Sequence, residues 1–487
     1  MVHESQIPRS CDRCHAVKER CYWALHEVQC ERCARLQLVC QINRPLRRPG
    51  RPRRLPSPSS QSRSHFDEIT SNQGHSTLSS APGGHRTATS QSDRWREVVI
   101  AAGVVLPSEL QLLDQSLFQN EFMEQFILGP SFCEEHRKYL ISHFLDSTVF
   151  LKDAYLACAL SWDGDEPSLS STPENEQPAS KAYQYASSAL STLGSFEVKD
   201  MQDLSVCLVL GAVVHTFAIR LRASDVLTIC RQTLNLIKAV YNSPSTRHIS
   251  SDSIGFLTCL ILTETAESLL SCSVPTIQFK LPLSEPAYVD RYVGICTTLL
   301  PLFYDLGKLS NDMLRERKER GVSHNLLLTT MAESLGALEL TIRNWRPSVP
   351  DGFAERFTST EVAHMLCQAQ VMQTTALLII HRLQYSFGSK EDKVLAMSFN
   401  ILTQLELTFI ATRKMVPCVD LPIVVSCMEL QDEEERARWL CNISPISRYS
   451  EPFHNRICQI LSAVWEARRH SAELHWYQLG DVIPHFS

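Results

Sequence analysis

The chain of 487 residues has no uninterrupted apolar run long enough to span a bilayer. Its most apolar stretch, 204–219, is interrupted by Ser205, His215 and Thr216, so it predicts a buried core helix. Residues 1–20 are polar and lack the apolar segment of a secretory signal peptide. We therefore expect an intracellular chain with no membrane partner.

Catalytic motifs are also missing. The sequence contains no G-x-S-x-G, H-E-x-x-H, phosphate-binding loop or dinucleotide fingerprint. His215, which lies in an apolar run, and His381, which precedes Arg382, are interpreted as structural histidines rather than catalysts. Strand-type alternation is scarce as well, whereas apolar residues recur at three and four. We expect a mostly all-α protein that is not an enzyme.

The charge of the chain is divided unevenly. Residues 1–54 hold twelve Lys and Arg against five Asp and Glu, a net charge of +7, and the remainder carries −13. A basic head can approach a polyanion, whereas an acidic body repels one. The asymmetry predicts a head that binds nucleic acid and a body with a different role.

Six of the eighteen cysteines fall within thirty residues near the N-terminus. They form the pattern C-x2-C-x6-C twice, at Cys11, Cys14, Cys21, Cys30, Cys33 and Cys40. Thiols stay reduced in an intracellular protein, so clustered cysteines indicate metal ligands rather than disulfides. The twelve other cysteines are scattered and are interpreted as small core residues.

The repeat suggests a two-metal site. Two tetrahedral zinc ions need eight ligand positions, which six thiolates supply if two of them bridge. By the symmetry of the repeat, Cys11 and Cys30 are the natural bridges. So short a segment cannot bury enough apolar surface to fold alone, and structural zinc contributes roughly 10–16 kcal/mol. A single four-thiolate zinc with two free cysteines is the structural alternative.

The segments CDRCHAVKERC and CERCARLQLVC resemble the fungal binuclear zinc cluster family of transcription factors, and all six spacings fit. The resemblance implies two structural Zn²⁺ ions and a helix after the second cysteine that enters the major groove of double-stranded DNA. In that family a lysine near the end of this helix reads a CGG-type element, and Lys18 matches its place. Arg20 matches the basic position before the third cysteine.

This sequence departs from the family pattern at several positions. His15 stands where arginine is usual, Val17 where another basic residue is common, and Tyr22 and Trp23 lie in a loop that often contains proline. The departures concern the preferred DNA triplet and leave the ligand set intact. We predict DNA contacts from Arg13, His15, Lys18 and Arg20, with a solvated basic face as the alternative for Lys18 and Arg20.

Residues 44–54 read RPLRRPGRPRR, and three prolines exclude a regular helix. Residues 49–53 resemble an AT-hook, whose arginines lie in the narrow minor groove of A·T-rich DNA, where negative potential is concentrated. We predict further DNA contacts from five of the six arginines of this extension, namely Arg47, Arg48, Arg51, Arg53 and Arg54. A nuclear-import signal is a compatible interpretation of the same run.

Residues 55–93 are rich in Ser, Thr, Gln and Pro and are predicted to be a disordered linker. The predicted organisation is therefore a zinc cluster over 1–43, the extension over 44–54, this linker and a helical regulatory domain over 94–487. No sustained heptad follows the cluster. Monomeric binding and a homodimer formed through the body both stay open.

Two apolar stripes illustrate the helical pattern of the body. One runs from Leu328 to Trp345 and ends before Pro347; the other runs from Val289 to Phe303, with Pro301 predicted to kink or end it. Three segments of the body, 338–350, 376–388 and 457–476, resemble the regulatory domain of one branch of the same family. The resemblance implies control of activity through ligands or partners, without catalysis.

Together these features predict a nuclear, zinc-dependent, sequence-specific transcription factor of RNA polymerase II genes. In filamentous fungi this architecture often governs one biosynthetic gene cluster, so the resemblance implies a pathway-specific regulator of secondary metabolism that works with co-regulators or the transcription machinery. The alternative is a zinc-bound interaction module that recruits proteins and does not read DNA. An enzyme with a DNA-targeting head is a third hypothesis.

Overall fold

A computed structural model describes Cys11, Asp12, Cys14, Lys18 and Cys21, and residues 30–36, 38, 40, 96, 100, 103–163, 176–221, 225–243, 249–280, 288–446, 450–470 and 473–483. The chain divides into two compact units, Met1–His85 and Arg86–Ser487, each of which is described by itself. The predicted extension and linker lie outside the described residues.

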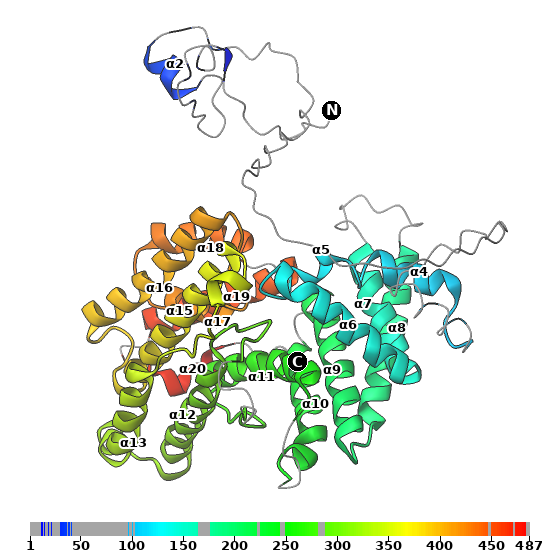
Figure 1. The fold of residues 1–487 in the computed structure, drawn as a ribbon. Coiled ribbons are helices and arrows are strands. Elements are labelled where there is room, and N and C mark those ends of the chain that lie inside the picture. Colours follow the sequence, from blue (N-terminus) through cyan, green and yellow to red (C-terminus); the bar gives the residue numbers. More distant parts are fainter. Residues whose placement is uncertain are drawn as a thin grey trace, which may run out of the picture. The chain divides into compact units, whose positions relative to one another are not determined.

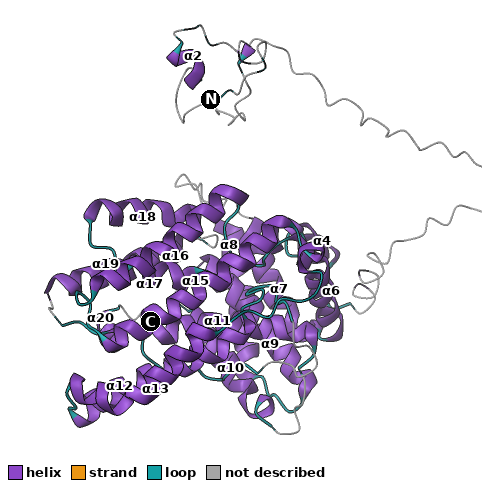
Figure 2. Cartoon of the chain, turned by 60° about the vertical axis from the view of Figure 1, so that its left-hand side comes forward, coloured by secondary structure: helices purple, strands orange, loops and turns teal. Residues whose placement is uncertain are grey.

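Within the described residues, all of the named elements are helices and none is a strand (Figure 2), which confirms the predicted all-α class. The first unit contains α2 (Glu31–Arg35). The second unit begins with α4 (Pro107–Gln115), α5 (Asn120–Met123), α6 (Pro130–Asp146), α7 (Thr148–Asp163), α8 (Glu176–Ser195), α9 (Met201–Leu221), α10 (Val226–Tyr241) and α11 (Ser251–Leu270). It continues with η2 (Thr297–Leu299), α12 (Leu300–Arg320), α13 (His324–Asn344), α14 (Phe353–Arg356), α15 (Ser359–Gln384), α16 (Glu391–Thr412), α17 (Asp420–Cys427), α18 (Glu433–Ile446), α19 (Glu451–His470), η3 (Trp476–Gln478) and α20 (Leu479–Val482).

Two large hydrophobic clusters form most of the core of the second unit, beside a small one between α7, α8 and α9. One large cluster is built mainly on α4–α11 and the other mainly on α12–α20. Helix α11 belongs to both, since Phe256 and Leu260 lie in the first cluster and Leu269 and Leu270 in the second. In Figure 1 this helix runs between the two halves of the unit. Packing changes along α11 therefore reach both halves.

Helix α19, near the C-terminal end of the second unit, returns to the first half and contacts α9. The Ser450 hydroxyl donates to the Ile219 carbonyl at 2.6 Å, and Arg456 pairs with Glu267 of α11 at 2.6 Å. These polar contacts join segments about two hundred residues apart in the sequence, so they fix α19 against the helices that it covers.

The stripe ending at Trp345 is a helix, as predicted. Helix α13 buries Leu327, Leu335 and Ile342 and ends before Trp345, whose indole N–H donates to the Thr298 hydroxyl at 2.9 Å. The next proline is Pro347, which cannot continue a helix.

The prediction of a helix from Val289 to Phe303 is wrong in its first part. Asp290 begins a turn in which its carboxylate accepts the amides of Tyr292 and Val293 at 2.7 and 3.1 Å, and Gly294 has φ 55°. Helix α12 begins only at Leu300, with Pro301 in its first turn. Proline suits that position because the N–H that it lacks would have no helical partner. Pro301 therefore starts a helix where the sequence pattern suggested an end.

Among the described residues, three helices, α9, α11 and α16, are long and apolar enough to cross a membrane by length and composition alone. Within their most apolar windows, α9 and α11 are 78% and 72% buried inside the unit, and α16 is 28% buried. The burial of α9 confirms the core helix predicted over 204–219. Core packing therefore explains the composition of α9 and α11, and only part of that of α16.

Candidate metal centre

All six clustered cysteines lie among the described residues, and the fold brings them together. Cys11, Cys14, Cys30 and Cys33 are fully buried, whereas Cys21 and Cys40 are half-buried. Each is a free thiol. Among the described residues of the first unit, the fully buried side chains are thus those of cysteines, with Leu38 packed against them.

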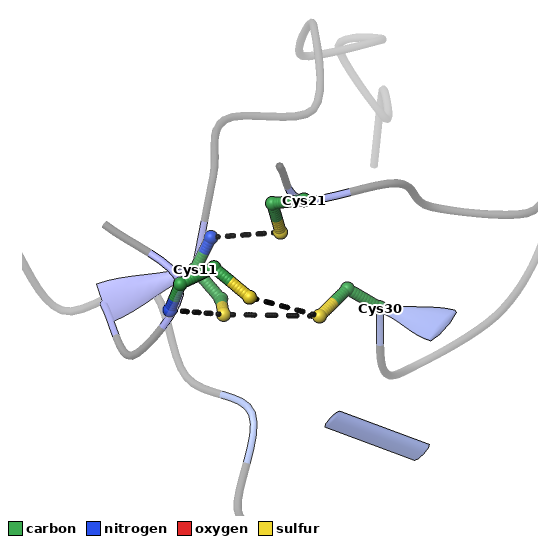
Figure 3. Close-up of side chains that lie close together, drawn as sticks. Cys11, Cys21 and Cys30 are labelled. Carbon is green, nitrogen blue, oxygen red and sulfur yellow. Dashed lines mark hydrogen bonds between the residues drawn. The ribbon is translucent and has the colours of Figure 1, made fainter. Parts of the chain in front are cut away.

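The sulfur atoms fall into two groups of four, within each of which all sulfurs lie inside 4.8 Å of one another. One group is Cys11, Cys14, Cys21 and Cys30, and the other is Cys11, Cys30, Cys33 and Cys40. Cys11 and Cys30 belong to both groups, and Figure 3 shows their side chains pointing toward each other from opposite chain segments. The arrangement matches the pair of bridges suggested by the symmetry of the repeat.

The distances between sulfurs suit a tetrahedral zinc site. Sγ of Cys11 lies 3.8 Å from that of Cys30 and 3.7 Å from that of Cys33, and Sγ of Cys14 lies 3.7 Å from that of Cys30. Zinc–thiolate bonds of about 2.3 Å give a tetrahedron whose edges are about 3.8 Å. The donor type and the spacing therefore both fit zinc, and the six thiols are the residues that would hold it.

Backbone amides reinforce the repeat. The Cys11 amide donates to the Cys21 sulfur at 3.2 Å, and the Cys30 amide donates to the Cys40 sulfur at 3.4 Å. The Cys14 amide donates to the Cys11 sulfur at 3.3 Å. Each half of the repeat thus folds its third cysteine back onto its first. Amide donors also stabilise thiolate charge, as the ligand chemistry requires.

These contacts shift the pKa values of the thiols in different directions. Burial raises the pKa of Cys11, but hydrogen bonds from the Cys14 amide and from neighbouring thiols outweigh it and lower the pKa to about 6. Cys30 follows the same rule, since its contacts lower its pKa against the effect of burial. Burial raises the pKa of Cys21 to about 12. The two shared sulfurs are thus the pair that the local contacts stabilise as thiolates.

Helix α2 positions the second half of the cluster. Cys30 is its N-cap residue and Cys33 lies one turn later, so the two sulfurs fall on the same side. In the first half, Asp12 and Cys14 are helical and Lys18 lies in an exposed turn with φ 55°. A left-handed residue is typical of the position just past a helix C-terminus. The structure thus exposes Lys18 beside the cluster.

The other predicted DNA contacts lie outside the described residues: Arg13, His15, Arg20, Arg47, Arg48, Arg51, Arg53 and Arg54. Two basic residues that the sequence analysis overlooked are described, namely Arg32 and Arg35 in the last turn of α2. Arg35 is exposed. Because the repeat has an offset of nineteen, Arg32 is the counterpart of Arg13 in the second half, and this offset could have identified it.

The helical unit identifies the class of the protein. The family model for the fungal specific transcription factor domain matches residues 115–482, most of that unit, and the chain belongs to this family. It is therefore a fungal-type transcription regulator, as its resemblance predicted. The match does not extend to the cysteine cluster. Searches of curated proteins and of solved structures found no match.

Proposed function

We propose that this chain is a zinc-dependent, sequence-specific DNA-binding transcription factor. The observation that carries the proposal is the pair of four-thiol groups that share Cys11 and Cys30. Such an arrangement fits two tetrahedral ions and leaves no ligand position open for catalysis. Bound zinc would supply the cross-links that fold this segment around its cysteines.

DNA reading is assigned to the surface around the cluster. Lys18 is exposed on one half of the repeat and Arg35 on the other, so cationic side chains flank the sulfur core. A side chain that reads base edges in the major groove discriminates between sequences, whereas one that contacts phosphate binds all sequences alike. Lys18 reads a CGG-type element, and the arginines of 44–54 add phosphate and A·T-rich minor-groove contacts.

The helical domain controls the output of the DNA reader. The protein acts in the nucleus, where its partners are co-regulators or the transcription machinery of RNA polymerase II genes. The organisation into cluster, extension, linker and helical domain follows the boundaries given above. The narrower proposal is a pathway-specific regulator of a biosynthetic gene cluster, which rests on the resemblance alone.

The test is selection of bound duplexes from a random library by the full chain, with zinc present and after chelation. The proposal predicts enrichment of a CGG-containing element that chelation abolishes. A Cys30→Ser chain should behave like the chelated protein, and a Cys441→Ser chain, altered at an exposed body cysteine, should behave like the parent. Equal recovery of all sequences under every condition would favour the interaction module.

A further inference from the structure

A cavity of about 90 Å³ lies where the two large hydrophobic clusters of the helical unit meet. Side chains of α9, α11, α17 and α19 contribute most of its wall. Leu262 and Phe453 pack against both clusters and border the cavity. A water-sized sphere takes roughly 10–15 Å³, so the space accommodates a small molecule of roughly six to nine heavy atoms.

The wall is mainly apolar, but His215, Thr216 and Thr263 form a polar corner. The Thr263 hydroxyl donates to the Cys259 carbonyl at 3.2 Å, so its oxygen accepts the Nε2–H of His215, 3.0 Å away. The other nitrogen, Nδ1, then accepts from the Cys259 thiol at 3.8 Å. Burial lowers the pKa of His215 to about 4, so this ring is neutral at pH 7.

The threonine hydroxyls of this corner have no proton left to donate to a ligand. The Thr216 hydroxyl donates to the Ala212 carbonyl at 2.8 Å, so both threonine protons are already committed to backbone carbonyls. Both oxygens keep lone pairs, since a hydroxyl has one proton and two acceptor sites. The threonine hydroxyls of this corner therefore offer acceptors, and they suit a ligand group that donates a proton.

The charged side chains in the cavity wall indicate which net charge a ligand can carry. Two residues of the cavity wall, Glu267 and Arg456, form an ion pair at 2.6 Å, so their charges largely cancel. Asp420 adds a second carboxylate to the lining. An anionic ligand would lose its hydration on entering this mainly apolar cavity, and its wall already holds carboxylates, so an uncharged ligand fits better.

From these observations we propose that the cavity binds a small, uncharged, mainly hydrophobic molecule with a hydroxyl group that donates to the hydroxyl oxygen of Thr263. The ligand would contact α11 and α19 together, and so both halves of the helical unit. Its binding would stabilise their mutual packing by mass action. This site is independent of the cysteine cluster, and its test is separate from that of DNA binding.

The test uses the full chain and three ¹⁹F probes of similar size: 4-fluorobenzyl alcohol, 4-fluorotoluene and 4-fluorobenzoate. Saturable line broadening in ¹⁹F spectra measures binding of each. We expect the alcohol to bind about three- to tenfold more tightly than the toluene, the difference made by one hydrogen bond. We expect no saturable binding of the benzoate. Equal binding of alcohol and benzoate, or no saturable binding of the alcohol, would overturn the proposal.

Two variants locate the binding. Thr263→Val is isosteric and should weaken the alcohol to the level of the toluene, whereas Thr341→Val, which removes an exposed hydroxyl with the same backbone bond, should change neither. Ala266→Leu places a larger side chain in the cavity and should abolish binding of both probes, whereas Ala337→Leu on the exposed face of α13 should not. Circular dichroism checks each fold. Unchanged binding in Thr263→Val and in a folded Ala266→Leu would contradict the site.

Discussion

The sulfur atoms of Cys11 and Cys30 lie 3.8 Å apart, and each belongs to both groups of four thiols. Nineteen residues separate the two cysteines, and the same offset relates every other ligand pair of the repeat. One ligand group cannot form without the two residues that the other also uses. The two halves of the cluster should therefore fold and bind metal as one unit.

Zinc content tests this coupling. Cys11→Ser or Cys30→Ser removes a ligand from both groups and should leave less than one zinc per chain. Cys21→Ser affects one group and should leave about one, because the other four thiols remain. Zinc per purified chain, measured by mass spectrometry of the metal, should be two for the parent and for Cys441→Ser. Equal losses in Cys30→Ser and Cys21→Ser would argue against shared ligands.

Lys18 tests the DNA-reading role of the cluster. Lys18→Ala should lower the affinity for a CGG duplex by roughly 1–3 kcal/mol without loss of zinc. Lys18→Gly should have a similar effect, although glycine suits the φ of 55° better than lysine does. The affinity for a scrambled duplex should fall much less. Full specific binding by Lys18→Gly would mean that the backbone, not the ammonium group, matters there.

The arginine extension should control the salt dependence of binding. Each arginine of 44–54 that neutralises a phosphate contributes roughly 0.9 to the slope of log affinity against log salt concentration. Replacing Arg51, Arg53 and Arg54 by glutamine should reduce that slope by about 2–3 while the preference for CGG persists. Titrations at several salt concentrations measure it. An unchanged slope would place these arginines away from the DNA.

A buried ion pair holds α15 against the residues that follow α17. The Arg382 guanidinium donates twice to the Glu429 carboxylate, at 2.7 Å each, and both side chains are 1% exposed. Arg382→Met leaves the carboxylate buried without its partner and should cost about 3–5 kcal/mol. Arg315→Met, which breaks an exposed pair with Glu319, should cost under about 1 kcal/mol. Urea midpoints compare the two variants, and similar losses would contradict this assignment.

Stability should depend on pH through buried histidines. Burial, helped by Lys393 and Arg382 and opposed by Glu339, lowers the pKa of His381 to about 4. The unfolded chain takes up this proton near pH 6.5, so the stabilising contribution is present above that pH and is lost as the pH falls toward 4. His381→Phe should therefore lose less of its unfolding temperature between pH 7 and 4.5 than the parent. Parallel curves would contradict this.

Much of the architecture could be predicted because its signals are local. The spacing of six cysteines suggested which pair is shared. The apolar residues that recur every three or four positions up to Trp345 predicted the helix α13. The turn from Asp290 to Gly294 could not be predicted. It depends on a buried carboxylate accepting two amides and on Met365 lying where a Cβ at Gly294 would clash, both of which are tertiary contacts. The cavity beside α11 could not be predicted either, because it arises from packing between two clusters, and the apolar periodicity of a sequence indicates helices but not the space between them.

The most direct measurement of the central claim is a fluorescence-anisotropy titration of the full chain at one salt concentration. It compares a CGG duplex with an adjacent A·T tract against a scrambled duplex, with and without a zinc chelator. The account predicts preferential binding of the CGG duplex that chelation abolishes and restored zinc recovers. Equal binding of both duplexes, unaffected by the chelator, would contradict it.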